Sequence, residues 1–172
     1  MKRLIVVRHA KSSEAEPGQK DFDRPLSDRG KKDASQMGQR LAGESISIDA
    51  FVSSPAKRAR KTCKLFMAEY NRNRDEIIFV DRLYHAPSET FYEVISELNS
   101  EIQSVAVFGH NPGITEFVNT LTNTMHTDNM PTAGVFAVEA DIRDWKEFQS
   151  AEKKFLFYEH PKMMGGVELL VD

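Results

Sequence analysis

Short apolar runs alternate along this chain with longer segments in which apolar residues recur every three to four positions. The runs lie at residues 4–7, 50–52, 77–80 and 105–108. The first of them, LIVV, is continuously apolar, which is typical of a parallel strand buried on both faces. Strands that alternate with helices predict a three-layer α/β/α fold, in which a mostly parallel central sheet is covered by helices on both faces.

Residues that favour helix starts follow these runs. Serine and asparagine are good N-caps, and proline is well tolerated at the first helical position. Beyond the fourth helix, the runs 135–138 and 155–158 indicate two further strands and favour an antiparallel pair, whereas residues 162–172 indicate no element. The candidate helix starts are Ser27, Ser53-Ser54-Pro55, Ser88 or Thr90, and Asn111-Pro112.

Length and composition favour one cytoplasmic domain spanning residues 1–172. The sequence shows no internal repeat or linker, and its net charge of −3 provides no basic field that would attract nucleic acid. The single cysteine, Cys63, cannot form an internal disulfide and lies on an apolar helical stripe, which indicates core packing. No apolar stretch is long enough to span a membrane, and the N-terminal run is too short for a secretory signal. We therefore expect neither a nucleic-acid partner nor a membrane partner.

Cationic and imidazole side chains follow three of the expected strands. Arg8 and His9 come directly after the first strand, Arg58 lies in the first turn of the helix after the second, and His110 follows the fourth. The carboxyl ends of parallel strands lie along one edge of the sheet, where ligands bind. Helix N-termini at the same edge add free N–H groups and positive dipole ends. The sequence therefore predicts an anion site.

A phosphoryl group suits such a site. It carries about −1.5 to −2 charges near neutral pH and is well held by the planar forks of Arg8 and Arg58. A histidine whose Nδ1–H is held by a backbone carbonyl has Nε2 free as a nucleophile. Since phosphoryl transfer depends mainly on positioning and charge neutralisation, we expect no cofactor and no metal. The carboxylates Asp21, Asp23 and Asp28 lack a spacing that pairs them with histidine ligands.

Three motifs resemble those of the histidine phosphatase superfamily, which shares the phosphoglycerate-mutase-like fold. They are RHA at residues 8–10, SSPAKRA at 53–59 with Thr62, and GHNP at 109–112. The usual first triplet is Arg-His-Gly, so the alanine is a departure. The small size and the segment DFDRPLS at 21–27, followed by Gly30, resemble the SixA-type protein-phosphohistidine phosphatases. The resemblance covers residues 2 to about 140.

The resemblance implies a phosphatase that works through a covalent phosphohistidine intermediate and releases inorganic phosphate. It makes His9 the phosphoryl acceptor and lets Arg8, Arg58 and His110 hold the phosphate. In SixA-type enzymes further active-site loop residues fall where this chain has Asp21 and Arg24, although these two are equally well explained as a loop ion pair. The histidines His126 and His160 are expected at the surface, and His85 either in a structural position or at the rim of the cleft.

The segment after the third strand bears on the substrate. Many superfamily members carry a glutamate there as general acid, but residues 81–86 read DRLYHA. The segment is also too short for a large lid insertion. Alkyl phosphate esters need a proton donor more than phosphoramidates do, because a protonated imidazole leaves as a neutral ring. The missing glutamate therefore favours phosphohistidine on a signalling or phosphotransfer protein as the substrate. Asp21 and His85 are candidate substitutes for the missing acid.

Two other functions fit the same residues. One is a phosphomonoesterase that acts on a small phosphorylated metabolite. The other is a non-catalytic phosphate- or phosphoprotein-binding module, although simple capture of phosphate requires no nucleophilic histidine. The sequence names neither the physiological substrate nor the oligomeric state.

Overall fold

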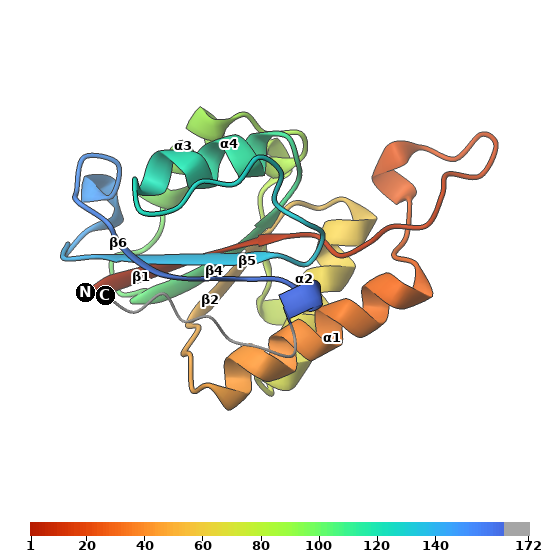
Figure 1. Cartoon of the computed structure of the whole chain (residues 1–172), viewed down its shortest axis with the longest axis horizontal. Coiled ribbons are helices and arrows are strands. Elements are labelled where there is room, and N and C mark those ends of the chain that lie inside the picture. The colour runs from red at the N-terminus through yellow and green to blue at the C-terminus, as the bar shows by residue number, and fades with distance from the viewer. Residues whose placement is uncertain (164–172) are drawn as a thin grey trace.

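A six-stranded sheet forms the centre of the molecule (Figure 1). The computed structural model describes residues 1–163 of the chain. Three of the strands contain the apolar runs at 4–7, 50–52 and 105–108, a fourth covers only part of the run at 77–80, and the last two contain the runs at 135–138 and 155–158. The strands are β1 (Lys2–Arg8), β2 (Ala50–Ser53), β3 (Ile78–Phe79), β4 (Ser104–Gly109), β5 (Val135–Ala140) and β6 (Lys154–Glu159).

The strand order is β3-β2-β4-β1-β5-β6. Strands β1 to β4 pair in parallel, β5 is antiparallel to β1, and β6 is antiparallel to β5. The expectation of a mostly parallel sheet with an antiparallel pair near the C-terminus is confirmed. Strand β3 is shorter than the apolar run predicted and lies at the sheet edge, where Ile78 is 42% and Phe79 45% exposed.

Helices cover both faces of the sheet, which gives the three layers. The alternation of side chains along β1 serves both cores, since Leu4 and Val6 pack in one and Ile5 and Val7 in the other. Figure 1 shows α3 and α4 on one side and α1 on the other; the buried stripes of α1 and α2 share one core. The helices are α1 (Asp28–Gly43), α2 (Lys57–Glu69), α3 (Ser88–Ser96) and α4 (Gly113–Leu121).

The observed helix starts agree only partly with the expected ones. Ser27 caps α1, and its side chain accepts the Gly30 N–H. Helix α3 begins at Ser88, one of the two expected positions, whereas α2 and α4 begin later than expected, after Ala56 and Pro112. None of the N-caps Ala56, Pro87 and Pro112 makes a side-chain cap bond.

Short 3-10 helices lie in the connections. Between β3 and α3 the chain runs only from Val80 to Pro87, so no large lid is inserted there. Within residues 1–163, no helix has the length and apolar character needed to cross a membrane. Cys63 is buried in the core beside α1, as expected. The 3-10 helices are η1 (Asp21–Asp23), η2 (Arg74–Glu76), η3 (Asp81–Leu83), η4 (Trp145–Glu147) and η5 (Pro161–Met163).

Candidate active site

The strand register brings three segments that are distant in sequence to one edge of the sheet. Arg8 pairs with Gly109, and Ser53 pairs with Phe108. The residues that follow are therefore neighbours: the backbone N–H of His9 donates to the Gly109 carbonyl at 3.1 Å. The predicted convergence of the first, second and fourth strand ends is confirmed.

His9 is held with one ring nitrogen fixed and the other facing the site. It is 6% exposed, and its Nδ1 lies 2.7 Å from the Ala10 carbonyl oxygen. A carbonyl can only accept, so Nδ1 carries the proton and Nε2 carries the lone pair, which accepts from Arg58 Nε. Burial is the main reason that the pKa of His9 is lowered to about 3, with Arg58 contributing. The imidazole is consequently neutral at physiological pH.

Arg58 spreads its guanidinium between the nucleophile candidate and a loop. Its Nε lies 3.4 Å from His9 Nε2, its Nη1 donates to the Asp21 carbonyl oxygen at 2.7 Å, and its Nη2 donates to Asp21 Oδ2 at 2.9 Å. The side chain is 3% exposed although it comes from the first turn of α2, so the cation is buried against these two partners.

Asp21 connects the loop after β1 to the segment after β3. Its Oδ2 accepts from the Tyr84 hydroxyl at 2.6 Å and lies 3.4 Å from His85 Nε2, and its Oδ1 lies 3.2 Å from Arg24 Nη2. The Tyr84 hydrogen bond, followed by the Arg58 one, lowers the pKa of Asp21 to about 2. The ion pair between Asp21 and Arg24, one of the two interpretations that the sequence left open, is present, and the same carboxylate also binds Arg58.

His110 faces His9 from the end of β4. The two ring centroids are 5.1 Å apart, and His110 Nε2 lies 2.8 Å from Ser54 Oγ. Its Nδ1 is buried and has no hydrogen-bond partner among residues 1–163. Burial, followed by the charge of His9, lowers the pKa of His110 to about 2.

Arg8 and Arg24 affect the site through their charge. Arg8 donates from Nη1 to the Met130 carbonyl at 2.7 Å, and its buried Nε has no partner in the described part of the chain. Both arginines lie near enough to His9 for their charges to lower its pKa. They therefore add positive potential beside the ring, whereas Arg58 touches it.

Three supporting residues were missed as site residues by the sequence reasoning. Tyr84 orients Asp21, and Ser54 contacts His110. The Thr62 hydroxyl accepts from the Ala10 N–H at 2.9 Å and donates to the Arg58 carbonyl at 2.8 Å. Ser54 and Tyr84 follow β2 and β3, so the strand-end rule that found His9 also applied to them. Thr62 was part of the motif that resembles the superfamily and lay on a predicted apolar helical stripe, but neither signal indicated a contact with Ala10.

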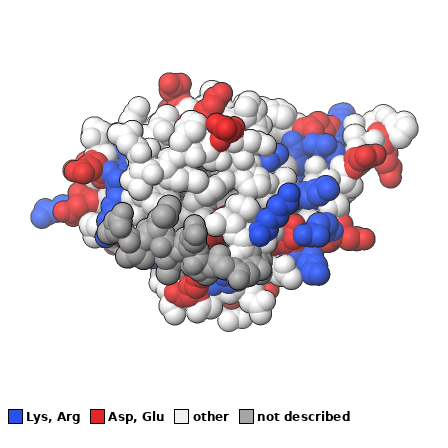
Figure 2. Space-filling model, in the orientation of Figure 1, with Lys and Arg blue, Asp and Glu red and all other residues white. Residues whose placement is uncertain are grey.

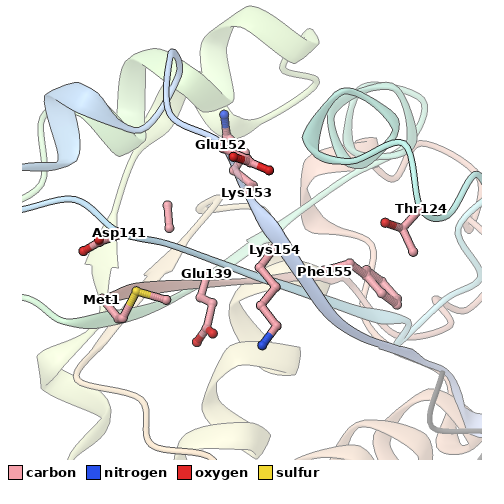
Figure 3. Close-up of a pocket in the computed structure, with 9 residues that line it drawn as sticks. Met1, Thr124, Glu139, Asp141, Glu152, Lys153, Lys154 and Phe155 are labelled. Carbon is pink, nitrogen blue, oxygen red and sulfur yellow. The ribbon is translucent and has the colours of Figure 1, made fainter. Parts of the chain in front are cut away.

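A pocket lies at the end of the sheet opposite to these residues (Figure 3). It is lined by Met1, Glu139 and Phe155 among others, near the point where Ala140 pairs with Lys2 at the start of β1. No group of three or more His, Cys, Asp or Glu side chains within the described range is arranged to hold a metal ion. The imidazoles and the buried guanidinium instead gather at the carboxyl edge.

Comparisons with known proteins agree with this arrangement. Residues 4–86 match the model of the histidine phosphatase superfamily (branch 1). An uncharacterised protein of Mycobacterium tuberculosis is 30% identical over 138 residues, which cover 75% of this chain and 84% of that protein. A structure from Agrobacterium tumefaciens, provisionally named the phosphohistidine phosphatase SixA, has a TM-score of 0.78 at 26% identity and covers 93% of this chain and 98% of its own.

A further structure, of the protein histidine phosphatase SixA with tungstate, has a TM-score of 0.79 at 20% identity, with 94% of this chain and 99% of that chain covered. At that identity the likeness concerns the fold alone. The family match and the relatives together show that this chain belongs to the histidine phosphatase superfamily and is a phosphatase.

Proposed function

We propose that this phosphatase transfers the phosphoryl group of its substrate to His9 and then to water, and that the substrate is phosphohistidine on a signalling or phosphotransfer protein. The observation that carries the proposal is the geometry of His9: a neutral ring, fixed through Nδ1, presents Nε2 to Arg58 at 3.4 Å and to the His110 ring. This is the arrangement that in-line attack by a nitrogen nucleophile needs.

The proposed reaction has two displacements. His9 Nε2 attacks phosphorus, a P–N bond forms, and the bond to the substrate imidazole breaks as that protonated ring leaves in its neutral form. Water then attacks the phosphorylated His9, which returns to the neutral ring with its proton on Nδ1, and inorganic phosphate departs. Arg58 and Arg8 neutralise the charge of the equatorial oxygens in both steps, and the uncharged His110 ring helps to hold them by hydrogen bonding.

The groups available as proton donors support a phosphohistidine substrate. Asp21 stands beside the site, but its pKa of about 2 keeps it ionised at neutral pH, so it is a poor acid. No glutamate occupies residues 81–86. An alkoxide leaving group therefore lacks a carboxylic acid donor here, whereas a protonated imidazole needs none.

One observation favours a small-molecule phosphomonoesterase as the second candidate. His85 is largely exposed, its Nε2 lies 3.4 Å from Asp21 Oδ2, and its ring centroid lies 5.9 Å from that of His110. A protonated His85 in this place can donate to an ester oxygen.

A cytoplasmic setting is part of our main proposal and rests on the single, buried cysteine.

Turnover compared across substrates tests the proposal. The purified chain is incubated with a phosphorylated histidine-containing phosphotransfer domain and, separately, with a panel of phosphorylated metabolites. We expect phosphate release from the protein at a higher kcat/KM than from any ester. Brisk hydrolysis of a metabolite with no release from the phosphoprotein would overturn the substrate assignment, and His85→Gln should then lower ester hydrolysis.

A further inference from the structure

A groove between α1, α2 and the loop before α1 is lined almost entirely by cations. We call it the basic groove. It has a volume of about 360 Å³, and among residues 1–163 its only uncharged lining residues are Pro25 and Leu26. No carboxylate from this described part of the chain lines it, although the chain as a whole has a net charge of −3. The cations are Lys31, Lys57, Arg60, Lys61, Lys64 and Arg74.

The charges of the basic groove are not neutralised by the protein itself. None of its six cations makes an ion pair or a side-chain hydrogen bond with residues 1–163. Other arginines on the same elements are paired: Arg29 with Asp33 at 3.1 Å, and Arg40 with Glu44 at 3.3 Å. Closely spaced like charges without partners repel one another, so an anionic partner would gain from binding there.

The basic groove adjoins the active site because both are built by the same two segments. Helix α2 carries Arg58 into the site and the groove lysines along its neighbouring face, and Lys64 lies about 9 Å along the axis from Arg58. The loop that brings Asp21 to Arg58 continues into Pro25 of the groove. Figure 2 shows several basic side chains, with acidic ones among them, at the end of the molecule where the loop of residues 9–27 projects in Figure 1.

We propose that the basic groove docks an acidic segment of the phosphoprotein substrate, next to the phosphohistidine that enters the active site. This inference rests on the proposed function and adds the chemical class of the surface recognised: glutamate and aspartate side chains on the residues flanking the phosphohistidine. Charge complementarity at such a rim acts mainly on the association rate and on specificity.

The composition of the groove favours an acidic protein over nucleic acid. Proteins bind single-stranded nucleic acids through aromatic side chains interleaved with cations. The described lining of the groove includes no aromatic residue. Its uncharged part, Pro25 and Leu26, instead suits the apolar flank of a peptide or helix. The overall negative charge of the chain also opposes a long polyanion more than a short acidic segment.

Charge reversal in the groove tests the docking. Two synthetic phosphohistidine peptides are compared that differ only in carrying Glu or Gln around the phosphohistidine. Wild type should prefer the Glu peptide in kcat/KM by about tenfold at low ionic strength, and added salt should erase the preference. Lys61→Glu/Lys64→Glu should abolish it while leaving hydrolysis of phosphoramidate unchanged. Arg143→Glu/Lys146→Glu, an equal charge change at exposed residues elsewhere, should retain it.

Binding of the unphosphorylated peptides, followed by fluorescence anisotropy, separates docking from chemistry. Tighter binding of the Glu peptide to wild type than to Lys61→Glu/Lys64→Glu supports the groove even if neither phosphopeptide is hydrolysed, a result that would refute the proposed substrate alone. Equal binding of both peptides, or a preference that survives the Lys61→Glu/Lys64→Glu change, would overturn the inference. So would a single-stranded oligonucleotide that binds the groove more tightly than the Glu peptide.

Discussion

Arg58 is the one cation whose guanidinium reaches both the nucleophile candidate and the loop. Its planar fork places Nε against His9 while Nη1 and Nη2 hold Asp21. Lysine, a single point charge, cannot occupy these directions together. We expect Arg58→Lys to lower kcat/KM by about 10²–10³, the cost of removing a preorganised donor. Steady-state kinetics with Arg60→Lys as the matched control checks this, and an Arg58→Lys enzyme as active as wild type would contradict it.

His9 is expected to carry the phosphoryl group itself. In the wild type a rapid quench should trap an adduct of one phosphoryl group on His9, stable to alkali and lost in acid, as a phosphoramidate is. His9→Ala should give neither adduct nor turnover, because no other described histidine combines a fixed Nδ1–H with a buried Nε2 beside an arginine. Peptide mapping by mass spectrometry locates the adduct. An adduct on His110, or activity that survives in His9→Ala, would move the nucleophile elsewhere.

The acidity of Asp21 is expected to depend on one hydroxyl. The Tyr84 hydrogen bond at 2.6 Å is the largest cause of the lowered pKa of Asp21, about 2 against an ordinary 3.8. Tyr84→Phe should therefore raise the pKa of Asp21 toward its ordinary value, and NMR titration of the carboxyl carbon measures it. Tyr92→Phe, which removes an exposed hydroxyl bonded to Thr120, should leave it unchanged. A pKa that stays at about 2 in Tyr84→Phe would assign the effect to the arginines.

At the scale of elements, the start of α4 packs against the segment that carries Tyr84 and His85. A Cβ on Gly113 would lie 1.7 Å from the Ala86 carbonyl oxygen, so any side chain there forces helix and segment apart. We expect Gly113→Ala to lower the free energy of unfolding by about 2–3 kcal/mol, the usual cost of overpacking. Gly43→Ala, at the end of α1 with no atom within 4 Å, should cost nothing. Urea denaturation measures the free energy of unfolding of both variants, and equal midpoints would refute the packing argument.

The elements themselves were largely predictable, and their boundaries were less so. The alternation of strands and helices was predicted from the periodicity of apolar residues. His9, Arg58 and His110 were predicted as site residues because they follow strands whose carboxyl ends meet at one edge of the sheet. The start of α2 was misplaced because Ser54 uses its hydroxyl on His110 and on the Ala56 N–H. In the same way Asn111 binds Asn129 and Thr115 instead of capping α4. Polar residues before these helices serve loop and site contacts that a local pattern does not reveal.

At the scale of the whole molecule, two buried histidines link stability to pH. Burial is the largest cause that lowers the pKa of His9 to about 3 and of His110 to about 2, from an ordinary 6.5. Below pH 6.5 the unfolded chain therefore binds more protons than the folded one, so stability is full above 6.5 and is lost as the pH falls toward 3. Each histidine contributes a slope of up to about 1.4 kcal/mol per pH unit.

Urea denaturation between pH 7 and pH 4 measures that slope. His9→Asn/His110→Asn should flatten the profile, while His126→Asn, at an exposed histidine, should keep it. A wild-type free energy of unfolding that does not change over this range would show that the two rings are accessible to protons in the folded state.

The sheet order and the basic groove lay beyond sequence reasoning. The hydrophobic pattern indicated parallel strands but could not place β5 between β1 and β6, because pairing partners depend on contacts distant in the chain. The lysines of α2 are visible in the sequence, but nothing in it shows that Lys31 and Arg74 complete the cluster. The last residues, 164–172, lie outside the described part of the chain.

The Thr62 hydroxyl affects how far the active site must rearrange when substrate binds. By joining the backbone beside His9 to that of Arg58, it fixes the distance between nucleophile and cation before any ligand arrives. A scaffold set in advance needs little reorganisation to meet the transferring group. The product, inorganic phosphate, then meets the same fixed donors that met the transferring group, without a rearrangement of the backbone beside His9 and Arg58.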